Sequence, residues 1–177
     1  MRYSIMIPFA ALALAACGAS ADDGKTGTDI SIDATTDEGE VVKASSDGKT
    51  GEVEINAPGF KASIAMPKVN LDSENFDMDG AKLCPGSKIL SMKVDNVMRA
   101  AGTKGDGGGT VRIRFDSPAA PDVVKAWFLN ELVNTAKYSL TATPEGLAGK
   151  NKDGDPFTLN LRAGEAGHSI GTMIVSG

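Results

Sequence analysis

The stretch TVRIRFDSPAAPDVVKAWF (residues 110–128) decides the fold, because it switches from one periodicity to another. In its first part, apolar side chains alternate with polar ones, which predicts a strand with one buried face and one solvated face. Ser117 and Pro118 follow, and both residue types favour the start of a helix. The stretch therefore predicts a strand that leads directly into a helix over residues 119–136.

The expected helix carries an apolar stripe, since residues spaced by four share one helical face. The stripe consists of Val124, Phe128, Leu132 and Ala136. Trp127 flanks this stripe, and we interpret it as a core residue rather than as an aromatic that stacks on a ligand. The helix should therefore pack against the apolar face of a sheet.

Strand patterns lie on both sides of this helix. Alternating or β-rich segments are found near residues 88–98, 138–142, 146–151, 157–161 and 169–175. Asp153-Gly154 predicts a hairpin turn, since this dipeptide tolerates positive φ. Short turns favour antiparallel pairing, so the expected fold class is α+β, an antiparallel sheet with one packed helix over residues 83–177. Residues 58–82 are expected to form a β-rich connecting segment.

The amino terminus has the pattern of an export signal. Basic Arg2 precedes an apolar run of about ten residues, which is roughly half of what a membrane-spanning helix needs. The run ends in Leu14-Ala15-Ala16-Cys17. This motif resembles the lipobox of bacterial lipoproteins, in which the cysteine sulfur takes up a diacylglycerol.

The resemblance implies that residues 1–16 are a signal peptide and that the mature chain begins at Cys17. Acyl chains on Cys17, palmitate among them, would then anchor the protein in a lipid bilayer. Gly18 stands where an Asp would favour the inner membrane, which implies the bacterial outer membrane with the domain in the periplasm. Lipidation of Cys17 leaves Cys84 as the only thiol, so no internal disulfide is expected.

Residues 17–57 are interpreted as an acidic tether. Residues 18–57 hold ten acids and three lysines, and their Asp, Gly, Ser and Thr content predicts a mostly flexible segment. The pentapeptide Asp-Gly-Lys-Thr-Gly occurs twice in it, at 23–27 and 47–51, and a short alternating segment follows each copy. These repeats are compatible with stacked solenoid turns or with hairpin turns.

The chain is acidic overall, with a net charge of −5 and no long basic run. Nucleic-acid binding is therefore not expected, because phosphate contacts need clustered Lys and Arg. The Gly-Lys-Thr triplets do not form a phosphate-binding loop, since Ala19 and Lys43 occupy the positions where that motif needs a glycine.

The sequence contains few candidates for chemistry. His168 is the only histidine and lies in a Gly-rich turn, so we interpret it as a surface residue. Cys84 is interpreted as an inert, semi-buried thiol. Residues 75–80 resemble half of a calcium-binding loop, but Gly86 stands where the loop needs a Glu. No catalytic residue, metal or cofactor is expected.

Three arginines are candidates for the solvent face of the sheet: Arg112, Arg114 and Arg162. They are interpreted as charges that keep this face soluble, or as a weakly basic patch facing a carbohydrate or a protein carboxylate.

The carboxy-terminal region is similar to a group of small bacterial envelope lipoproteins of unknown function. The similarity is carried by residues 83–89, by the strand–Ser-Pro–helix passage at 110–128 and by the hairpin at 153–154. It supports a fold but implies no activity. The expected function is a non-enzymatic binding or envelope-maintenance module with an envelope protein or polymer as partner. The alternatives are a small enzyme or enzyme accessory acting on envelope polymers, and a surface-exposed stalk.

Overall fold

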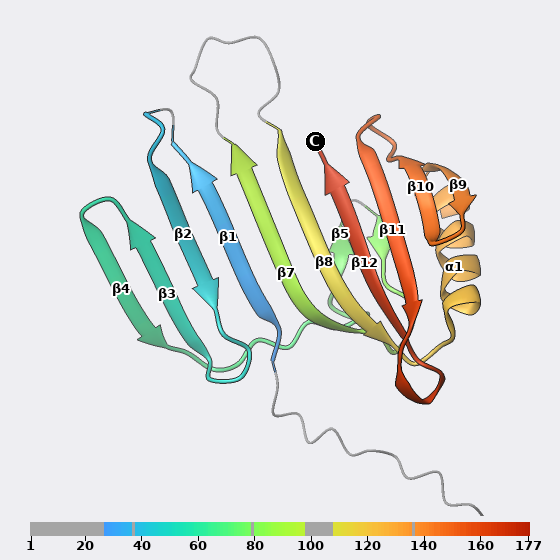
Figure 1. Ribbon diagram of the computed structural model, residues 1–177, viewed down its shortest axis with the longest axis horizontal. Helices are drawn as coiled ribbons and strands as arrows, with labels where there is room; N and C mark the ends of the chain where they lie inside the picture. The colour runs from blue at the N-terminus through green and yellow to red at the C-terminus, as the bar shows by residue number, and fades with distance from the viewer. Residues whose placement is uncertain (1–26, 37, 79, 98–107, 136) are drawn as a thin grey trace, which may run out of the picture.

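The computed structural model describes residues 27–36, 38–78, 80–97, 108–135 and 137–177 (Figure 1). Ten strands form one mixed sheet in the order β4-β3-β2-β1-β7-β8-β12-β11-β10-β9. Their bounds are β1 Asp29–Thr35, β2 Val41–Ser46, β3 Glu52–Ala57, β4 Phe60–Ala65, β7 Lys88–Val97, β8 Gly109–Ser117, β9 Ser139–Thr143, β10 Gly146–Lys150, β11 Pro156–Ala163 and β12 Ser169–Ser176. A separate small hairpin pairs β5 (Asp77–Met78) with β6 (Ala81–Lys82).

The helix α1 spans Pro121–Asn130 and continues into a π-helical turn at Glu131–Thr135. Its first residue is Pro121, whose ring fixes φ in the helical range. The predicted start at Ser117-Pro118 was therefore too early, because Ser117 still pairs with Ser169 in the sheet. The stripe residues Val124, Phe128 and Leu132 are fully buried, while Ala136 lies outside the described residues.

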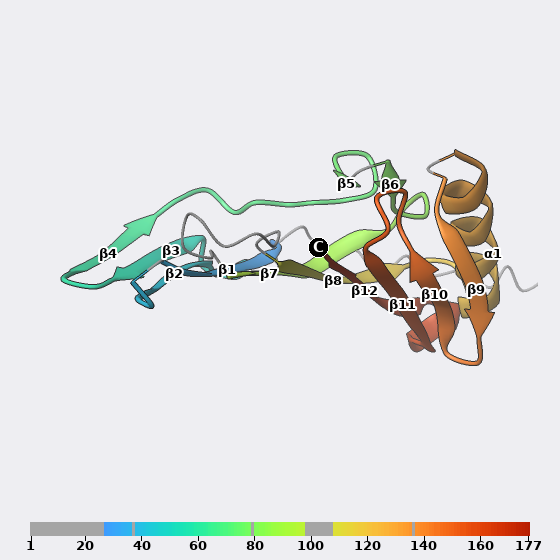
Figure 2. The same cartoon turned by 90° about the horizontal axis from the view of Figure 1, so that it is seen from above.

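The hydrophobic core lies on one face of the sheet and under one half of it. There α1 and the β5–β6 hairpin cover strands β7 to β12 (Figure 2). The buried core combines apolar residues of these strands with the helix stripe; its largest members include Ile113, Phe115, Phe128, Phe157, Leu159 and Met173. Trp127 is partly buried against this core, and its ring meets that of Phe128 edge-on at 5.1 Å. The interpretation of Trp127 as a packing residue agrees with this position.

The expected α+β class is wrong, because the described chain is mainly β with a single short helix. Residues 29–57, expected to lie mostly in a flexible tether, form β1, β2 and β3 of the main sheet. The sheet is also mixed rather than antiparallel, since β1 runs parallel to β7. Polar, Gly-rich composition suggested a tether, but one apolar face per strand and a neighbouring edge are sufficient for pairing.

Strands β1 to β4 form an antiparallel meander in a single layer. Each strand pairs with the next, and none of their residues belongs to the buried core. The arrangement is thus a flat extension of the sheet rather than a stack of solenoid turns (Figure 1). The second pentapeptide copy, residues 47–51, is the turn between β2 and β3.

The two faces of this extension differ sharply in chemistry. The face continuous with the core carries Ile30, Ile32, Ala34, Val42, Ala44, Ser46, Val53, Ile55, Ala57, Phe60, Ala62 and Ile64. The opposite face carries Asp, Glu, Lys, Ser and Asn side chains from the same strands. Because the side-chain period of a strand is two, each strand contributes to both faces.

Thr28 joins the extension to the rest of the fold. Its side chain is 1% exposed, and its hydroxyl donates to the Ile89 carbonyl at 2.8 Å. The same oxygen accepts the Leu71 N–H at 3.1 Å. One buried hydroxyl therefore links the start of β1 to β7 and to the connection that follows β4.

Candidate functional site

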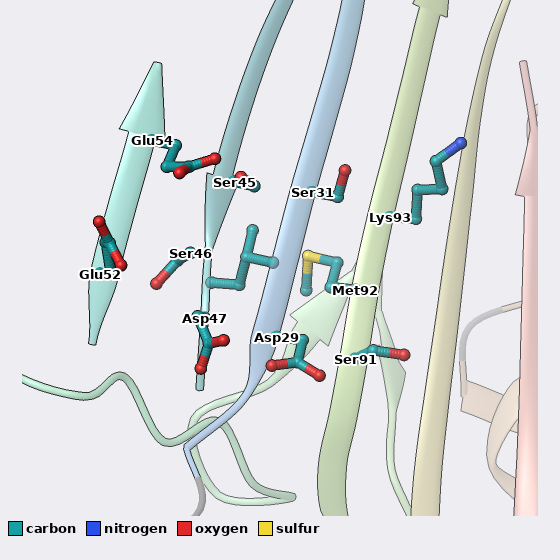
Figure 3. Close-up of a pocket in the computed structure, with 11 residues that line it drawn as sticks. Asp29, Ser31, Ser45, Ser46, Asp47, Glu52, Glu54, Ser91, Met92 and Lys93 are labelled. Atoms are coloured by element: carbon teal, nitrogen blue, oxygen red, sulfur yellow. The ribbon is translucent and has the colours of Figure 1, made fainter. Parts of the chain in front are cut away.

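A shallow groove of about 580 Å3 lies over the extension, and most of its lining side chains belong to the polar face (Figure 3). It runs across β3, β2, β1 and β7. Its lining consists of Asp29, Ile30, Ser31, Ser45, Ser46, Asp47, Glu52, Glu54, Ser91, Met92 and Lys93.

Strand register sets the order of charges along the groove. Glu54 pairs with Ser45, Ser45 with Ser31, and Ser31 with Lys93. These four side chains therefore form one row across four strands, with a carboxylate at one end and an ammonium at the other (Figure 3). Arg112 of β8 follows Lys93 in the same row.

Two further carboxylates of the groove, Asp29 and Asp47, accept backbone N–H groups of the β2–β3 turn. Asp29 accepts the Gly48 N–H at 2.9 Å, and Asp47 accepts the N–H groups of Lys49 and Thr50 at 2.6 and 2.9 Å. These backbone donors lower the pKa of Asp47, because they stabilise its ionised form. The carboxylate of Asp47 therefore stays charged well into the acid range.

At the ammonium end of the row, Lys93 pairs with two carboxylates. Its Nζ lies 2.9 Å from Asp95 and 3.3 Å from Asp33. The hydrogen bond to Asp95, then that to Asp33, raises the pKa of Lys93, since both favour the ammonium form. Lys93 is thus a fixed positive charge at neutral pH, and the hydroxyls of Ser31 and Ser45 separate it from Glu54.

Hydrogen-bonding and charged groups dominate the lining. The carboxylates of Asp29 and Asp47 are exposed and accept backbone N–H groups, and Glu52 accepts the Ser63 hydroxyl. The groove can accept hydrogen bonds and attract opposite charges at its two ends. Within the described residues, no group of three or more His, Cys, Asp or Glu side chains is placed to hold a metal ion.

The predicted candidates for chemistry lie elsewhere. Cys84 is buried in the core, and desolvation raises the pKa of its thiol against the opposing effect of Ser117. His168 lies 3.2 Å from Asp116 through Nδ1. Asp116 and Ser117 are consecutive in β8, so their side chains point to opposite faces of the sheet. The sheet therefore separates Cys84 from His168.

The predicted acidic loop at 75–80 contains the β-hairpin residue Asp77, whose carboxylate accepts the Gly80 N–H at 2.9 Å. Asp79 lies outside the described residues. The carboxylate of Asp77 therefore stabilises the turn between β5 and β6.

The three predicted arginines are exposed on the same face of the sheet as the groove. Arg112 and Arg114 lie in β8 and Arg162 in β11, which places positive charge beyond the basic end of the groove. Cys17 and the rest of the lipobox lie outside the described residues.

The groove was not predicted from the sequence. Its residues come from four strands, one of which, β2, has only Val42 and Ala44 to mark its apolar face. The alternation of Glu52, Glu54 and Asn56 with apolar residues was the one available signal, but it does not reveal which strands are neighbours.

No family model matches the chain, and no significant match was found among curated proteins or solved structures. None of the helices in the described part of the chain has the length and apolar character needed to cross a bilayer.

Proposed function

We propose that the protein is a lipid-anchored envelope protein of bacteria that uses the polar groove as a binding surface. The observation that carries the anchor is the motif Leu14-Ala15-Ala16-Cys17 at the end of a short apolar segment. A glycine after the cysteine favours the outer membrane, with the sheet in the periplasm.

The start of the sheet supports a position close to the bilayer. β1 begins at Asp29, 29 − 17 = 12 residues after Cys17. A fully extended chain covers about 3.3–3.6 Å per residue, so these twelve residues span at most about 43 Å. Asp29 also lines the groove, so a bound partner would lie within that distance of the anchor.

The charge order of the groove indicates the kind of partner. Glu52 and Glu54 attract a cationic group at one end, while Arg112 attracts an anionic group beyond the other end, where Lys93 is already paired with Asp33 and Asp95. The serine hydroxyls between them suit a polymer with hydroxyl or amide groups. An envelope protein segment or a peptide-bearing envelope polymer has this chemistry.

The anchor is tested by Cys17→Ser in a bacterial host fed an alkyne-labelled palmitate analogue. The wild-type protein should take up the label and fractionate with membranes, whereas the variant should remain unlabelled and unprocessed or soluble. Gly18→Asp should keep the label but move the protein to the inner membrane. Unlabelled wild-type protein would contradict the anchor.

Binding is tested by crosslinking in intact envelopes, with identification of the attached protein or polymer. Glu54→Gln removes the acidic end of the central row and should reduce the crosslinked product several-fold. Glu145→Gln, an exposed carboxylate between β9 and β10, is the matched control. Equal crosslinking by both variants would contradict a role for the groove.

A further inference from the structure

Strand β4 ends the sheet and pairs only with β3 (Figure 1). Exposed apolar side chains are concentrated on it and just after it: Phe60 is 56% exposed, Ile64 50% and Met66 51%. At the opposite end of the sheet, β9 has none of the large exposed apolar side chains of the described chain. The two sheet edges are therefore not equivalent.

Backbone direction shows which groups of β4 face outward. The N–H of Met66 donates to the Gly51 carbonyl at 2.8 Å, so Met66 faces the β3 side. Backbone groups alternate in direction along a strand, which places Phe60, Ala62 and Ile64 toward β3 as well. The N–H and C=O groups of Lys61, Ser63 and Ala65 therefore point away from the sheet.

We propose that β4 pairs antiparallel with β4 of a second copy of the chain, about a two-fold axis through Ser63. This register uses the outward N–H groups of Lys61, Ser63 and Ala65 in both copies. A register centred on Ala62 would leave the outward groups of Ala65 unpaired. Two ten-stranded sheets become one continuous sheet.

The register matches the side chains on the apolar face. Phe60 lies opposite the partner's Met66, and Ala62 lies opposite the partner's Ile64. The large Phe60 ring thus packs beside the flexible Met66 side chain of the other copy, and the small Ala62 beside the branched Ile64. The three most exposed apolar groups of this edge become cross-strand neighbours, an arrangement that stabilises sheets.

The charges on the polar face are complementary in the same register. Lys61 lies opposite the partner's Ala65, and within each copy Ala65 pairs with Glu52. Lys61 therefore lies two strands from the partner's Glu52, about 10 Å between backbones, with only the small side chain of the partner's Ala65 between them. The long Lys61 side chain can span this gap, twice across the axis. Within one copy, Lys61 pairs with Asn56 instead, four residues along β3 from Glu52 and about 13 Å away. Among the described residues, Lys61 takes part in no ion pair.

This self-complementarity favours a second copy over an unrelated strand. Two copies of β4 can pair antiparallel only if each residue fits the residue of the other copy that lies opposite it. A lysine on an edge strand has another common role, which is to prevent pairing. That role predicts a monomer, so the two interpretations differ in a measurable way. The pairing does not require the lipid anchor.

The test is sedimentation velocity of detergent-solubilised full-length protein over a range of concentrations. Wild type should form a dimer. Ser63→Pro removes an outward N–H, which a single edge strand tolerates, and should weaken the dimer by about tenfold or more. Ser63→Ala keeps the N–H and should dimerise within about threefold of wild type. Circular dichroism melting checks that each variant is folded.

A charge exchange tests the register without a proline. Lys61→Glu places two carboxylates together in the dimer and should weaken it, and the double variant Lys61→Glu, Glu52→Lys should restore it. The two residues are too far apart in one copy for this rescue to arise within the monomer. Monomeric wild type, a dimer unaffected by Ser63→Pro or absence of rescue would overturn the proposal. Binding of β4 to a different protein without self-association would overturn it as well.

Discussion

The two halves of the main sheet are stabilised in different ways. Strands β7 to β12 bury one face under α1 and the β5–β6 hairpin, and they contribute all of the main-sheet residues in the hydrophobic core. Strands β1 to β4 continue the same sheet as a single layer, with partly exposed apolar side chains (Figure 2). The comparison shows that strand pairing extends a sheet beyond its core, provided that the first added strand is well joined.

Substitution of a core aromatic residue should give the largest difference in stability loss between the two halves. Phe128 is fully buried and contacts the Phe115 ring at a centroid distance of 5.8 Å, so Phe128→Ala should lower the free energy of unfolding by about 3–5 kcal/mol. Phe60→Ala, in the single layer, should change it by no more than about 0.5 kcal/mol in the monomer. Urea unfolding measures both, and similar losses would contradict the comparison.

The half formed by β7 to β12 and α1 is the thick half of the molecule, and β1 to β4 form the thin half. Close packing inside the thick half predicts the next largest loss of stability. A Cβ on Gly171 would collide with the Phe115 ring, which is itself fully buried. Gly171→Ala should therefore cost about 1–3 kcal/mol through overpacking. Gly109→Ala is the control, because its Cβ would lie 3.6 Å from the Asp95 carbonyl oxygen, an ordinary contact. A neutral Gly171→Ala would show that the core adapts more freely than its packing indicates.

The buried Thr28 hydroxyl supports the junction between the halves, beside the parallel β1–β7 ladder. Thr28→Val keeps the shape of the side chain but leaves the Ile89 carbonyl and the Leu71 N–H without their partner. Loss of a buried partner costs about 1–3 kcal/mol. Thr50→Val, whose hydroxyl is exposed and accepts the Glu52 N–H at 3.2 Å, should cost less. Thermal melting measures both variants. Equal losses of stability would contradict a particular role of the Thr28 hydroxyl at the junction.

The β2–β3 turn predicts the smallest effect, which is present at neutral pH and disappears in acid. Folding lowers the pKa of Asp47, so its contribution to stability is present above the unfolded pKa of about 3.9. That contribution is lost as the pH falls through the lower, folded pKa. Asp47→Asn should therefore lower the melting temperature slightly at pH 7 and flatten the acid limb of the stability curve, so that variant and wild type converge in acid. An unaltered acid limb would contradict this role of the carboxylate.

Local pattern predicted much of the thick half. The alternation around Ile113, the apolar stripe of the helix and the Asp153-Gly154 turn each report a local preference, and β8, α1 and the β10–β11 hairpin are present there. The helix start was misplaced because two prolines follow Ser117, and only Pro121 begins the helix.

The thin half could not be assembled from the sequence. Alternation at Ile30, Ile32 and Ala34 indicated a strand, but its partner β7 lies about sixty residues further along the chain. Periodicity shows which face a residue occupies and not which strand lies beside it. The groove depends on that pairing, since Ser31 meets Lys93 only through the parallel β1–β7 ladder. For the same reason, the charge row across it was not predictable.

Residue-resolved hydrogen exchange on the monomeric full-length protein tests the difference between the halves most directly. Strands β3 and β8 are both internal to the sheet and hydrogen-bonded on both sides, so pairing alone would protect their amides equally. If burial of one face is decisive, β8 amides should exchange only through global unfolding, whereas β2 and β3 amides should open at a lower free energy. Equal protection of β3 and β8 would contradict the account.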